Sequence, residues 1–264
     1  PLGADTAGPR YLDPDGSFPN HIPNPENETA MQSILDAVQE SKADLGIIFD
    51  TDVDRAGAVL SDGAELNRNR IIAMMAAILL REHPGTTIVT DSITSTGLAA
   101  FIRKNGGVHH RFKRGYRNVI NESMRLNREG HDSQLAMETS GHGALKENYF
   151  LDDGAYLVTR LLIELARAKK EGYTLESLIA DLAEPAESKE FRMNILVPDF
   201  KAYGQKIIDE LNVYAASQPG WSVAPDNFEG VRVNLDKAHG DGWFLLRMSV
   251  HDPILPLNIE SNSV

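Results

Sequence analysis

The feature that most constrains the fold is a short apolar run that leads directly into three carboxylates. Residues 45–49 read Leu-Gly-Ile-Ile-Phe, which is typical of a buried strand, and Asp50, Asp52 and Asp54 follow at alternate positions before Arg55. At about 5 Å, each pair of like charges costs on the order of 3 kcal/mol at an effective dielectric of about 20. Three such pairs rival the stability of a whole domain, so the loop predicts a bound cation. Carboxylate oxygens without cysteine or histidine favour a hard ion such as Mg²⁺.

Three other interpretations of this loop compete with the metal site. A charged surface turn rarely needs three aspartates at alternate positions after an apolar run. A calcium EF-hand needs Gly at loop position six and Glu at position twelve, and this chain has neither, with Ser61 at the twelfth position. The strand-end Asp-x-Asp also resembles the motif of haloacid-dehalogenase-like phosphatases, although that family places Thr or Val where Asp54 stands. This hydrolase alternative stays open.

Size and composition set broad limits on the class of protein. The chain has 264 residues, of which 42% are hydrophobic and 24% charged, as in an ordinary globular protein of one large or two to three small domains. The longest apolar run, residues 71–80, is too short for a transmembrane helix. The absence of cysteine excludes disulfides and thiolate metal sites. A net charge of −12 argues against a nucleic-acid binder, so an anionic ligand needs local basic clusters.

Alternating helix and strand signals predict an α/β fold in three parts. Residues 1–64 start with a long loop and continue with a helix at 28–41 and a strand pair, 45–49 and 56–60, around the aspartates. Residues 65–184 form a compact α/β domain, and residues 185–264 a small α+β domain. The expected helices are 67–82, 95–105, 117–127, 153–170, 175–182 and 200–216. The expected strands are 87–90, 108–112, 134–138, 191–196, 231–235, 243–248 and 254–259, with a further short one near residue 223.

Three further clusters carry polar chemistry. Residues 138–142 present the carboxylate of Glu138, the hydroxyl of Ser140 and the imidazole of His142, which suits a polyhydroxyl ligand and equally suits a solvated turn. Basic residues 109–117 surround Gly115 where a strand passes into a helix, which favours an anion site over a charge-protected strand edge. Residues 247–253 offer a guanidinium, a hydroxyl and an imidazole, which is compatible with a phosphate loop and also common in turns.

Taken together, three motifs resemble those of the α-D-phosphohexomutases, the phosphoglucomutases and phosphomannomutases. The motifs are Asp50 to Arg55, Glu138 to His142, and Asp152-Asp153-Gly154 at the start of a long helix, in the order and spacing of that family. The resemblance implies that this chain holds the last part of the second family domain, the whole third and the fourth. The sequence of residues 249–257 resembles that of the members from plants and algae.

The resemblance also implies roles for particular residues. It implies that Mg²⁺ is bound by Asp50, Asp52 and Asp54, and that sugar hydroxyls are held by Glu138 and Ser140. Lys113 matches a lysine near the transferring phosphate, and Arg55 and His142 complete the polar wall of the catalytic site. The non-reacting phosphate is expected to bind Arg247, Ser249 and His251.

The chain departs from the family pattern at several positions. Val250 and His251 stand where the family has Asn and Thr, and Tyr116 replaces a histidine, so phosphate recognition is expected to differ. The Ser-His-Asn loop that carries the family's phosphoserine does not occur in these residues. We therefore expect the N-terminal domain to lie in the same polypeptide or in another chain, because a sheet truncated here exposes an unpaired strand.

Two functions follow from the resemblance. The first is reversible phosphoryl transfer between C1 and C6 of a hexose phosphate through a phosphoserine and a bisphosphate, with one Mg²⁺ and a glucose 1,6-bisphosphate-type activator. This chain alone is then inactive. The second is a non-catalytic, sugar-phosphate-binding fragment or pseudoenzyme with an interaction role. The compartment is expected to be cytoplasm or plastid stroma, with no nucleic-acid or membrane partner.

Overall fold

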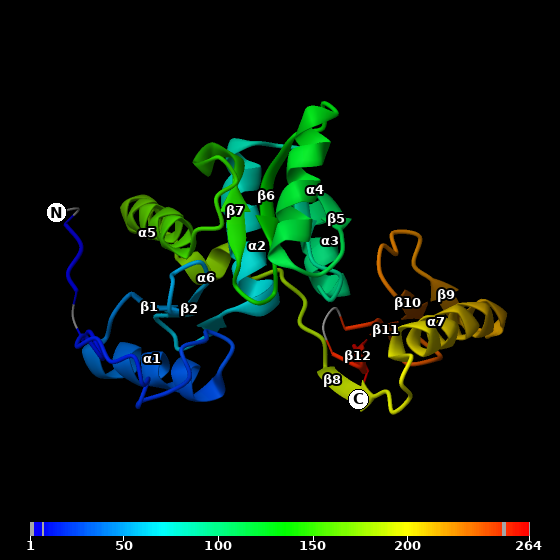
Figure 1. Cartoon of the computed structure of the whole chain (residues 1–264). Coiled ribbons are helices and arrows are strands. Elements are labelled where there is room, and N and C mark those ends of the chain that lie inside the picture. The colour runs from blue at the N-terminus through cyan, green and yellow to red at the C-terminus, as the bar shows by residue number, and fades with distance from the viewer. Residues whose placement is uncertain (1–2, 7, 250–251, 264) are drawn as a thin grey trace.

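The fold consists of three consecutive units, each with its own sheet (Figure 1). The computed structural model describes residues 3–6, 8–249 and 252–263. The N-terminal unit has a three-stranded sheet, the central unit a four-stranded sheet and the C-terminal unit a five-stranded sheet. The predicted α/β fold with a small C-terminal α+β part is confirmed.

The N-terminal unit supports the aspartate loop. Its described residues before Asn27 contain no helix or strand, as predicted. The elements that follow are α1 (Glu28–Ser41), β1 (Leu45–Phe49), β2 (Ala56–Leu60) and β3 (Glu65–Leu66). Asn27 caps α1 by accepting a hydrogen bond from the Ala30 N–H at 3.1 Å. All three strands are antiparallel, and among the described residues no strand pairs with the free edge of β1.

The central unit is a mixed sheet with helices on both faces. Its strands are β4 (Thr87–Thr90), β5 (Val108–Arg111), β6 (Ser133–Met137) and β7 (Gly143–Leu145), in the order β5-β4-β6-β7. The first three are parallel and β7 is antiparallel. Its helices are α2 (Arg68–Glu82), α3 (Thr96–Lys104), α4 (Tyr116–Arg128), α5 (Gly154–Glu171) and α6 (Leu175–Leu178), with a 3₁₀ turn at Lys146–Asn148. The predicted elements are present, with ends shifted by a few residues, but β3 and β7 were missed because two or three residues show no periodicity.

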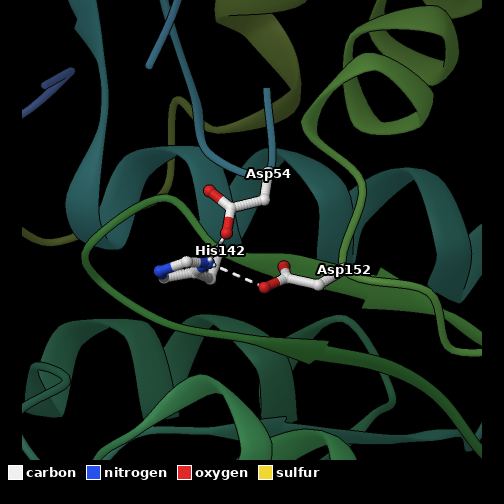
Figure 2. Close-up of side chains that lie close together, drawn as sticks. All are labelled: Asp54, His142 and Asp152. Atoms are coloured by element: carbon white, nitrogen blue, oxygen red, sulfur yellow. Dashed lines mark hydrogen bonds and ion pairs between the residues drawn. The ribbon is translucent and has the colours of Figure 1, made fainter. Parts of the chain in front are cut away.

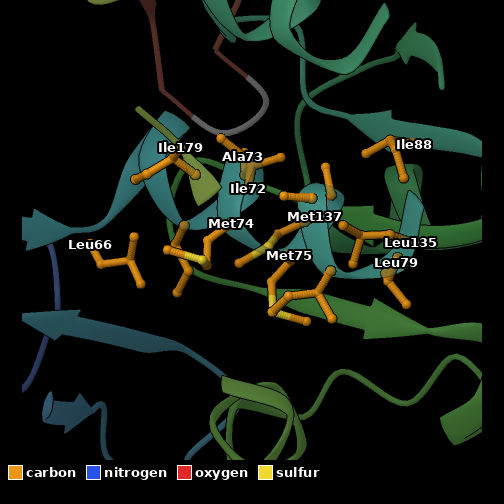
Figure 3. Close-up of a cluster of buried hydrophobic side chains, with 14 of the residues drawn as sticks. Leu66, Ile72, Ala73, Met74, Met75, Leu79, Ile88, Leu135, Met137 and Ile179 are labelled. Carbon is orange, nitrogen blue, oxygen red and sulfur yellow. The ribbon is translucent and has the colours of Figure 1, made fainter. Parts of the chain in front are cut away.

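Helix α2 is the centre of the main core. All ten residues from Ile71 to Leu80 are buried, so this stretch of the helix has no solvent-exposed face. The reason is that α2 lies between two sheets, with Leu60 and Leu66 of the N-terminal unit in the same cluster as Ile88 and Leu135 of the central one (Figure 3). The shared core fixes the aspartate loop relative to the central unit. No helix in the described part of the chain is long and apolar enough to cross a bilayer.

The C-terminal unit is an antiparallel sheet covered by one helix. Its elements are β8 (Glu187–Asn194), α7 (Phe200–Ser217), β9 (Trp221–Val223), β10 (Val231–Leu235), β11 (Gly242–Leu246) and β12 (Ile254–Ser261). The strand order is β8-β12-β11-β10-β9. Ile208 of α7 packs with Val231 and Val233 of β10 in a separate core. Strand β8 starts four residues before its predicted beginning at Phe191, because it is an exposed edge strand whose charged residues hide the apolar alternation.

Candidate functional site

The aspartate loop is the tip of the β1–β2 hairpin. Phe49 pairs with Ala56, so the six residues between them form one closed loop. Arg55 holds the loop from inside: its Nε lies 2.6 Å from Asp50 Oδ2 and its backbone N–H donates to Asp50 Oδ1 at 3.2 Å. Asp50 at the end of β1 and Arg55 at the start of β2 therefore bind each other and order the loop between them.

The three loop carboxylates are close enough to share one cation. Each of Asp50, Asp52 and Asp54 places a carboxylate oxygen within 4.8 Å of the others. Asp54 Oδ1 is buried without a hydrogen-bond partner among the described residues. A hard divalent ion with oxygen ligands fits this donor set, since all three ligands are carboxylates and one buried oxygen lacks a donor.

The charges in the loop also affect one another's protonation. Burial, together with the neighbouring Asp50, raises the pKa of Asp54 to about 6. Burial acts to raise the pKa of Asp50 as well, but the donors of Arg55 outweigh it and the pKa of Asp50 is lowered. Asp50 is thus held as an anion by Arg55, and a bound cation would favour the ionised form of Asp54.

His142 lies beside the loop between two carboxylates (Figure 2). Its Nδ1 is 2.8 Å from Asp152 Oδ2 and 3.5 Å from Asp54 Oδ2. Burial acts to lower the pKa of His142, but the Asp152 hydrogen bond and the charges of Asp152 and Asp54 outweigh it and the pKa is raised. The imidazole is consequently held in one orientation, with its Nε2 directed away from the pair in the view of Figure 2.

Asp152 is a site residue for which the sequence predicted no role. The sequence does contain a sign of this residue. Two aspartates, Asp152 and Asp153, precede α5, and only one of them can be the N-cap of the helix. Asp153 is that cap and accepts from the Tyr156 N–H at 2.9 Å. Asp152 does not cap the helix; it pairs with His142 and also accepts a hydrogen bond from the Gly143 N–H at 3.1 Å.

Backbone contacts clamp the aspartate loop to the central unit. Arg55 and His142 form an antiparallel bridge, and the Ala56 N–H donates to Gly141 O at 3.3 Å. The Gly154 N–H at the start of α5 donates to Val53 O at 2.9 Å. A Cβ at position 154 would lie 2.8 Å from that same oxygen, so only glycine allows this approach. Segments that are distant in the sequence are therefore joined through main-chain atoms.

Glu138 and Ser140 lie where β6 meets the start of α4. Glu138 is buried, and its Oε1 accepts from the Gly115 N–H at 2.5 Å while its Oε2 accepts from Ser140 Oγ at 3.3 Å. Tyr116 stacks on His142, with 4.8 Å between ring centroids. Glu138, Ser140 and His142 thus form one polar wall next to the aspartate loop.

Asp91 lies beneath this wall and is a second residue that sequence reasoning missed. It is fully buried and accepts from Thr139 Oγ1 at 2.8 Å. Burial, followed by the charge of Glu138, raises its pKa to about 7. No sequence motif marks the position after β4, so the proximity of Asp91 to Thr139 is visible only from the pairing of β4 with β6.

The basic segment before α4 divides into buried and exposed residues. Arg111 is buried and donates to the carbonyls of Thr94 and Ser95 at 3.3 and 2.8 Å, so its guanidinium is engaged by the backbone. Lys113 is exposed, and its ammonium lies 6.0 Å from the centre of the Phe112 ring. Of these two cations, Lys113 is therefore the one open to an anion.

The predicted phosphate loop lies in the C-terminal unit. Arg247 follows β11 and is 9% exposed, and its Nε has no partner among the described residues. Burial lowers its pKa. Ser249 Oγ accepts from the Asp252 N–H at 3.2 Å, and His251 lies outside the described residues. Within the described part of the chain, no hydrogen bond or ion pair joins Arg247 or Ser249 to the aspartate loop.

Comparison with known proteins supplies the family. Residues 5–63 match the family model described as "Phosphoglucomutase/phosphomannomutase, alpha/beta/alpha domain II", and residues 67–185 match the corresponding domain III. The two matches together take in more than half of the chain. The chain belongs to the phosphoglucomutase/phosphomannomutase family.

Individual relatives agree with this membership. The Pseudomonas putida phosphomannomutase/phosphoglucomutase is 33% identical over 97% of this chain and 51% of its own length. A phosphoglucomutase/phosphomannomutase family protein from Burkholderia thailandensis has a structure that matches with a TM-score of 0.77 and 31% identity, over 95% of this chain and 50% of its own. The chain spans about half the length of the curated relatives it matches.

A more distant mutase shares the fold. The Aspergillus fumigatus N-acetylphosphoglucosamine mutase matches with a TM-score of 0.55 and 14% identity, over 87% of this chain and 49% of its own. That protein was solved with GlcNAc-6P and magnesium, and a single-residue variant of it was solved with glucose 1,6-bisphosphate.

Proposed function

We propose that the protein to which this chain belongs is a phosphohexomutase that moves a phosphoryl group between the C1 and C6 oxygens of an aldohexose. The transfer passes through a phosphoserine and a sugar bisphosphate, and a glucose 1,6-bisphosphate-type activator starts it. The observation that supports this proposal most strongly is the clamp between the aspartate loop and the Glu138–His142 wall, in a chain of the phosphoglucomutase/phosphomannomutase family.

The proposed metal ligands are Asp50, Asp52 and Asp54. When bound, Mg²⁺ offsets negative charge on the migrating phosphoryl group, and phosphoryl transfer depends mostly on positioning and electrostatics. Arg55 keeps Asp50 ionised and fixes its carboxylate in the loop. The loop is thus ready for a cation before any ligand arrives.

The proposed sugar contacts are Glu138 and Ser140. Glu138 already accepts from the Gly115 N–H, which holds its carboxylate in place while its second oxygen and the Ser140 hydroxyl face a sugar. His142, fixed by Asp152, and Arg55 complete the catalytic wall, and Lys113 supplies an exposed cation for the phosphoryl group.

The proposed phosphate contacts are Arg247, Ser249 and His251. A buried guanidinium with an unpartnered Nε suits a phosphate that replaces its lost hydration. Val250 and His251 depart from the family pattern, so phosphate recognition in this part of the site is expected to differ from that of other members.

We infer the rest of the protein from the family. Residues 1–64, 65–184 and 185–264 correspond to the end of the second domain, the third and the fourth, and the phosphoserine domain lies in the same or another polypeptide. Residues 249–257 resemble members from plants and algae, which makes plastid stroma or cytosol the proposed compartment. The alternative function is a non-catalytic sugar-phosphate-binding fragment or pseudoenzyme with an interaction role.

A coupled mutase assay with glucose 1-phosphate and a bisphosphate activator tests the proposal. The assay is run on the protein with its upstream sequence. Asp52 is the exposed member of the loop, so Asp52→Ala is expected to abolish activity and leave the fold intact. Asp13→Ala, an exposed aspartate in the N-terminal loop, is the control and should keep activity.

Three outcomes discriminate the candidates. Wild-type turnover that survives Asp52→Ala contradicts the proposal. Release of inorganic phosphate without isomerisation favours the hydrolase alternative. Binding of the sugar phosphate without turnover, in a protein that has no upstream Ser-His-Asn loop, favours the pseudoenzyme.

A further inference from the structure

The central and C-terminal units are joined by several side-chain contacts, among them Arg114 with Glu190 of β8 at 3.7 Å and Thr96 Oγ1 with Glu260 of β12 at 3.2 Å. The loop between β9 and β10 places Asp226 3.7 Å from Arg111, and Phe228 packs against Phe112 with 4.9 Å between ring centroids and 51° between the ring planes. Arg232 in β10 donates to Ser92 O at 2.6 Å. These contacts hold the units against each other, but none of them touches a residue of the proposed ligand sites.

Glu229 is different because it binds the backbone of the segment that carries Lys113, whereas Glu190 pairs with the Arg114 side chain. Its Oε1 accepts from the Arg114 N–H at 2.8 Å, and the same oxygen accepts from Ser92 Oγ. Lys113 immediately precedes Arg114, and Gly115 immediately follows it and donates to Glu138. Two adjacent backbone N–H groups therefore bind two carboxylates, one from the sugar-binding wall and one from the C-terminal unit.

On its other side, Glu229 is followed in the chain by Gly230, which lies against the backbone of Arg247. Val231 pairs with Leu246 in the sheet, which places Gly230 opposite Arg247. A Cβ on Gly230 would lie 2.7 Å from Arg247 Cα and 2.1 Å from Leu246 O, so the two backbones are in direct contact. The Glu229 charge also acts on the Arg247 guanidinium and opposes the lowering of its pKa by burial.

We propose that Glu229 is a positioning residue that fixes the distance between Arg247 and the Lys113–Gly115 segment. A phosphorylated hexose that binds both regions needs them at a fixed separation, and Glu229 connects them through the main chain, at Arg114 on one side and through Gly230 on the other. The inference rests on the proposed function only for the identity of the ligand, because the contacts themselves involve no ligand.

The hydrogen-bonding role gives a specific expectation for two variants. Glu229→Ala removes the acceptor for both donors. Glu229→Gln keeps a carbonyl oxygen that accepts from them and removes only the charge. If the acceptor oxygen sets the separation of the two regions, Glu229→Ala loses that separation and Glu229→Gln keeps it.

The first readout is the distance between the two units without ligand. The chain has no cysteine, so Arg128→Cys in α4 and Asn212→Cys in α7, both at exposed positions, accept a spin label each. Double electron–electron resonance should give one narrow distance distribution for the otherwise wild-type chain and for Glu229→Gln. Glu229→Ala should broaden the distribution rather than shift it, because Arg232 and Phe228 still join the units.

The second readout is the affinity of the chain for glucose 6-phosphate with Mg²⁺, measured by calorimetry. Glu229→Ala should weaken binding about tenfold, because a smaller fraction of the free chain then holds Arg247 and Lys113 at the separation that the ligand needs, and Glu229→Gln should restore it. Ser92→Ala removes one of the two donors to Glu229, and its affinity for glucose 6-phosphate should lie between those of the wild type and Glu229→Ala. Circular dichroism of each variant checks that it is folded.

The proposal is overturned if Glu229→Ala leaves both the distribution and the affinity unchanged. It is also overturned if the distribution broadens without any loss of affinity, or if a folded Glu229→Gln is as defective as Glu229→Ala. A wild-type chain that binds no glucose 6-phosphate, but whose distribution responds to the variants as described, contradicts the proposed function and supports the positioning role.

Discussion

The two halves of the candidate site are built in different ways. The aspartate loop and the Glu138–His142 wall are joined by main-chain hydrogen bonds, a backbone bridge and the close approach at Gly154. The Arg247 region is joined to the central unit by side chains, chiefly Glu229 and Arg232. Main-chain contacts within one shared core do not depend on any single side chain, whereas contacts between separate cores can be removed by one substitution. We therefore call the half proposed to bind metal the fixed half, and the half proposed to bind phosphate, whose position depends on side chains such as Glu229, the adjustable half.

The largest effect is expected from filling the close approach at the clamp. Gly154→Val places a branched side chain against Val53 O, and should destabilise the chain by about 3 kcal/mol and abolish binding of Mg²⁺. Thermal unfolding by circular dichroism and a metal titration measure the two effects. Gly16→Ala is the control, because its Cβ has no atom within 4 Å. Unchanged Mg²⁺ affinity in Gly154→Val would contradict the claim that main-chain contacts at Gly154 position the aspartate loop.

The next effect concerns the side-chain junction. Arg232→Ala removes hydrogen bonds to Ser92 O and Thr94 O and should destabilise the C-terminal unit by about 2–3 kcal/mol without changing Mg²⁺ affinity. Both tryptophans, Trp221 and Trp243, belong to this unit, so the urea midpoint of tryptophan fluorescence reports on it alone.

The control for that variant is another arginine of the same sheet. Arg192 is exposed and forms a surface ion pair with Glu190, so Arg192→Ala should change stability by about 0.5 kcal/mol or less. A loss of Mg²⁺ affinity in Arg232→Ala would show that the two halves are not independent.

Much of the fixed half follows from local sequence. Asp50 and Arg55 belong to one loop, and Glu138 and His142 to another, so the spacing along the chain already brings them together. Their mutual contact depends on how the hairpin docks on β6 and β7, and β7 was not predicted. Asp152 lay next to a predicted helix start, and only the choice of Asp153 as the cap identifies it.

The adjustable half follows far less from sequence. Glu229 and Ser92 are 137 residues apart, and no periodicity or motif links a loop between two strands to a turn in another unit. The buried positions of Arg111 and Arg232 also escape prediction, because arginine is usually exposed and only backbone carbonyls from a neighbouring turn make burial possible.

A smaller effect, dependent on pH, tests the buried acid beneath the wall. The pKa of Asp91 is raised to about 7 from its ordinary value of 3.8, so the folded chain holds this proton more tightly than the unfolded chain. As pH rises from about 4 to 7, the unfolded chain loses the proton first, and the free energy of unfolding falls.

Asp91→Asn has no such proton and should gain stability over the wild type across the same pH range, by on the order of 1–2 kcal/mol at pH 7.5. Urea unfolding at several pH values measures the difference. Asp13→Asn, at an exposed position, should show no such trend. A difference between Asp91→Asn and wild type that is constant with pH would contradict the assignment.

The smallest effect is expected from the aromatic contact at the junction. Phe228→Ala removes the contacts with Phe112 and His110 and should lower the stability of the C-terminal unit by about 1 kcal/mol. Tryptophan fluorescence again gives the midpoint. Leu196→Ala, with a side chain that is 92% exposed, should have almost no effect, and equal shifts in the two variants would contradict a contribution of Phe228 to docking.

Calorimetric titration of the folded chain with Mg²⁺ tests the central claim most directly, because Asp50, Asp52 and Asp54 are proposed to share one cation. One ion per chain should bind to the wild type and to Asp13→Ala, and none to Asp52→Ala. Failure of the folded wild type to bind Mg²⁺, or equal binding by Asp52→Ala, would contradict the account.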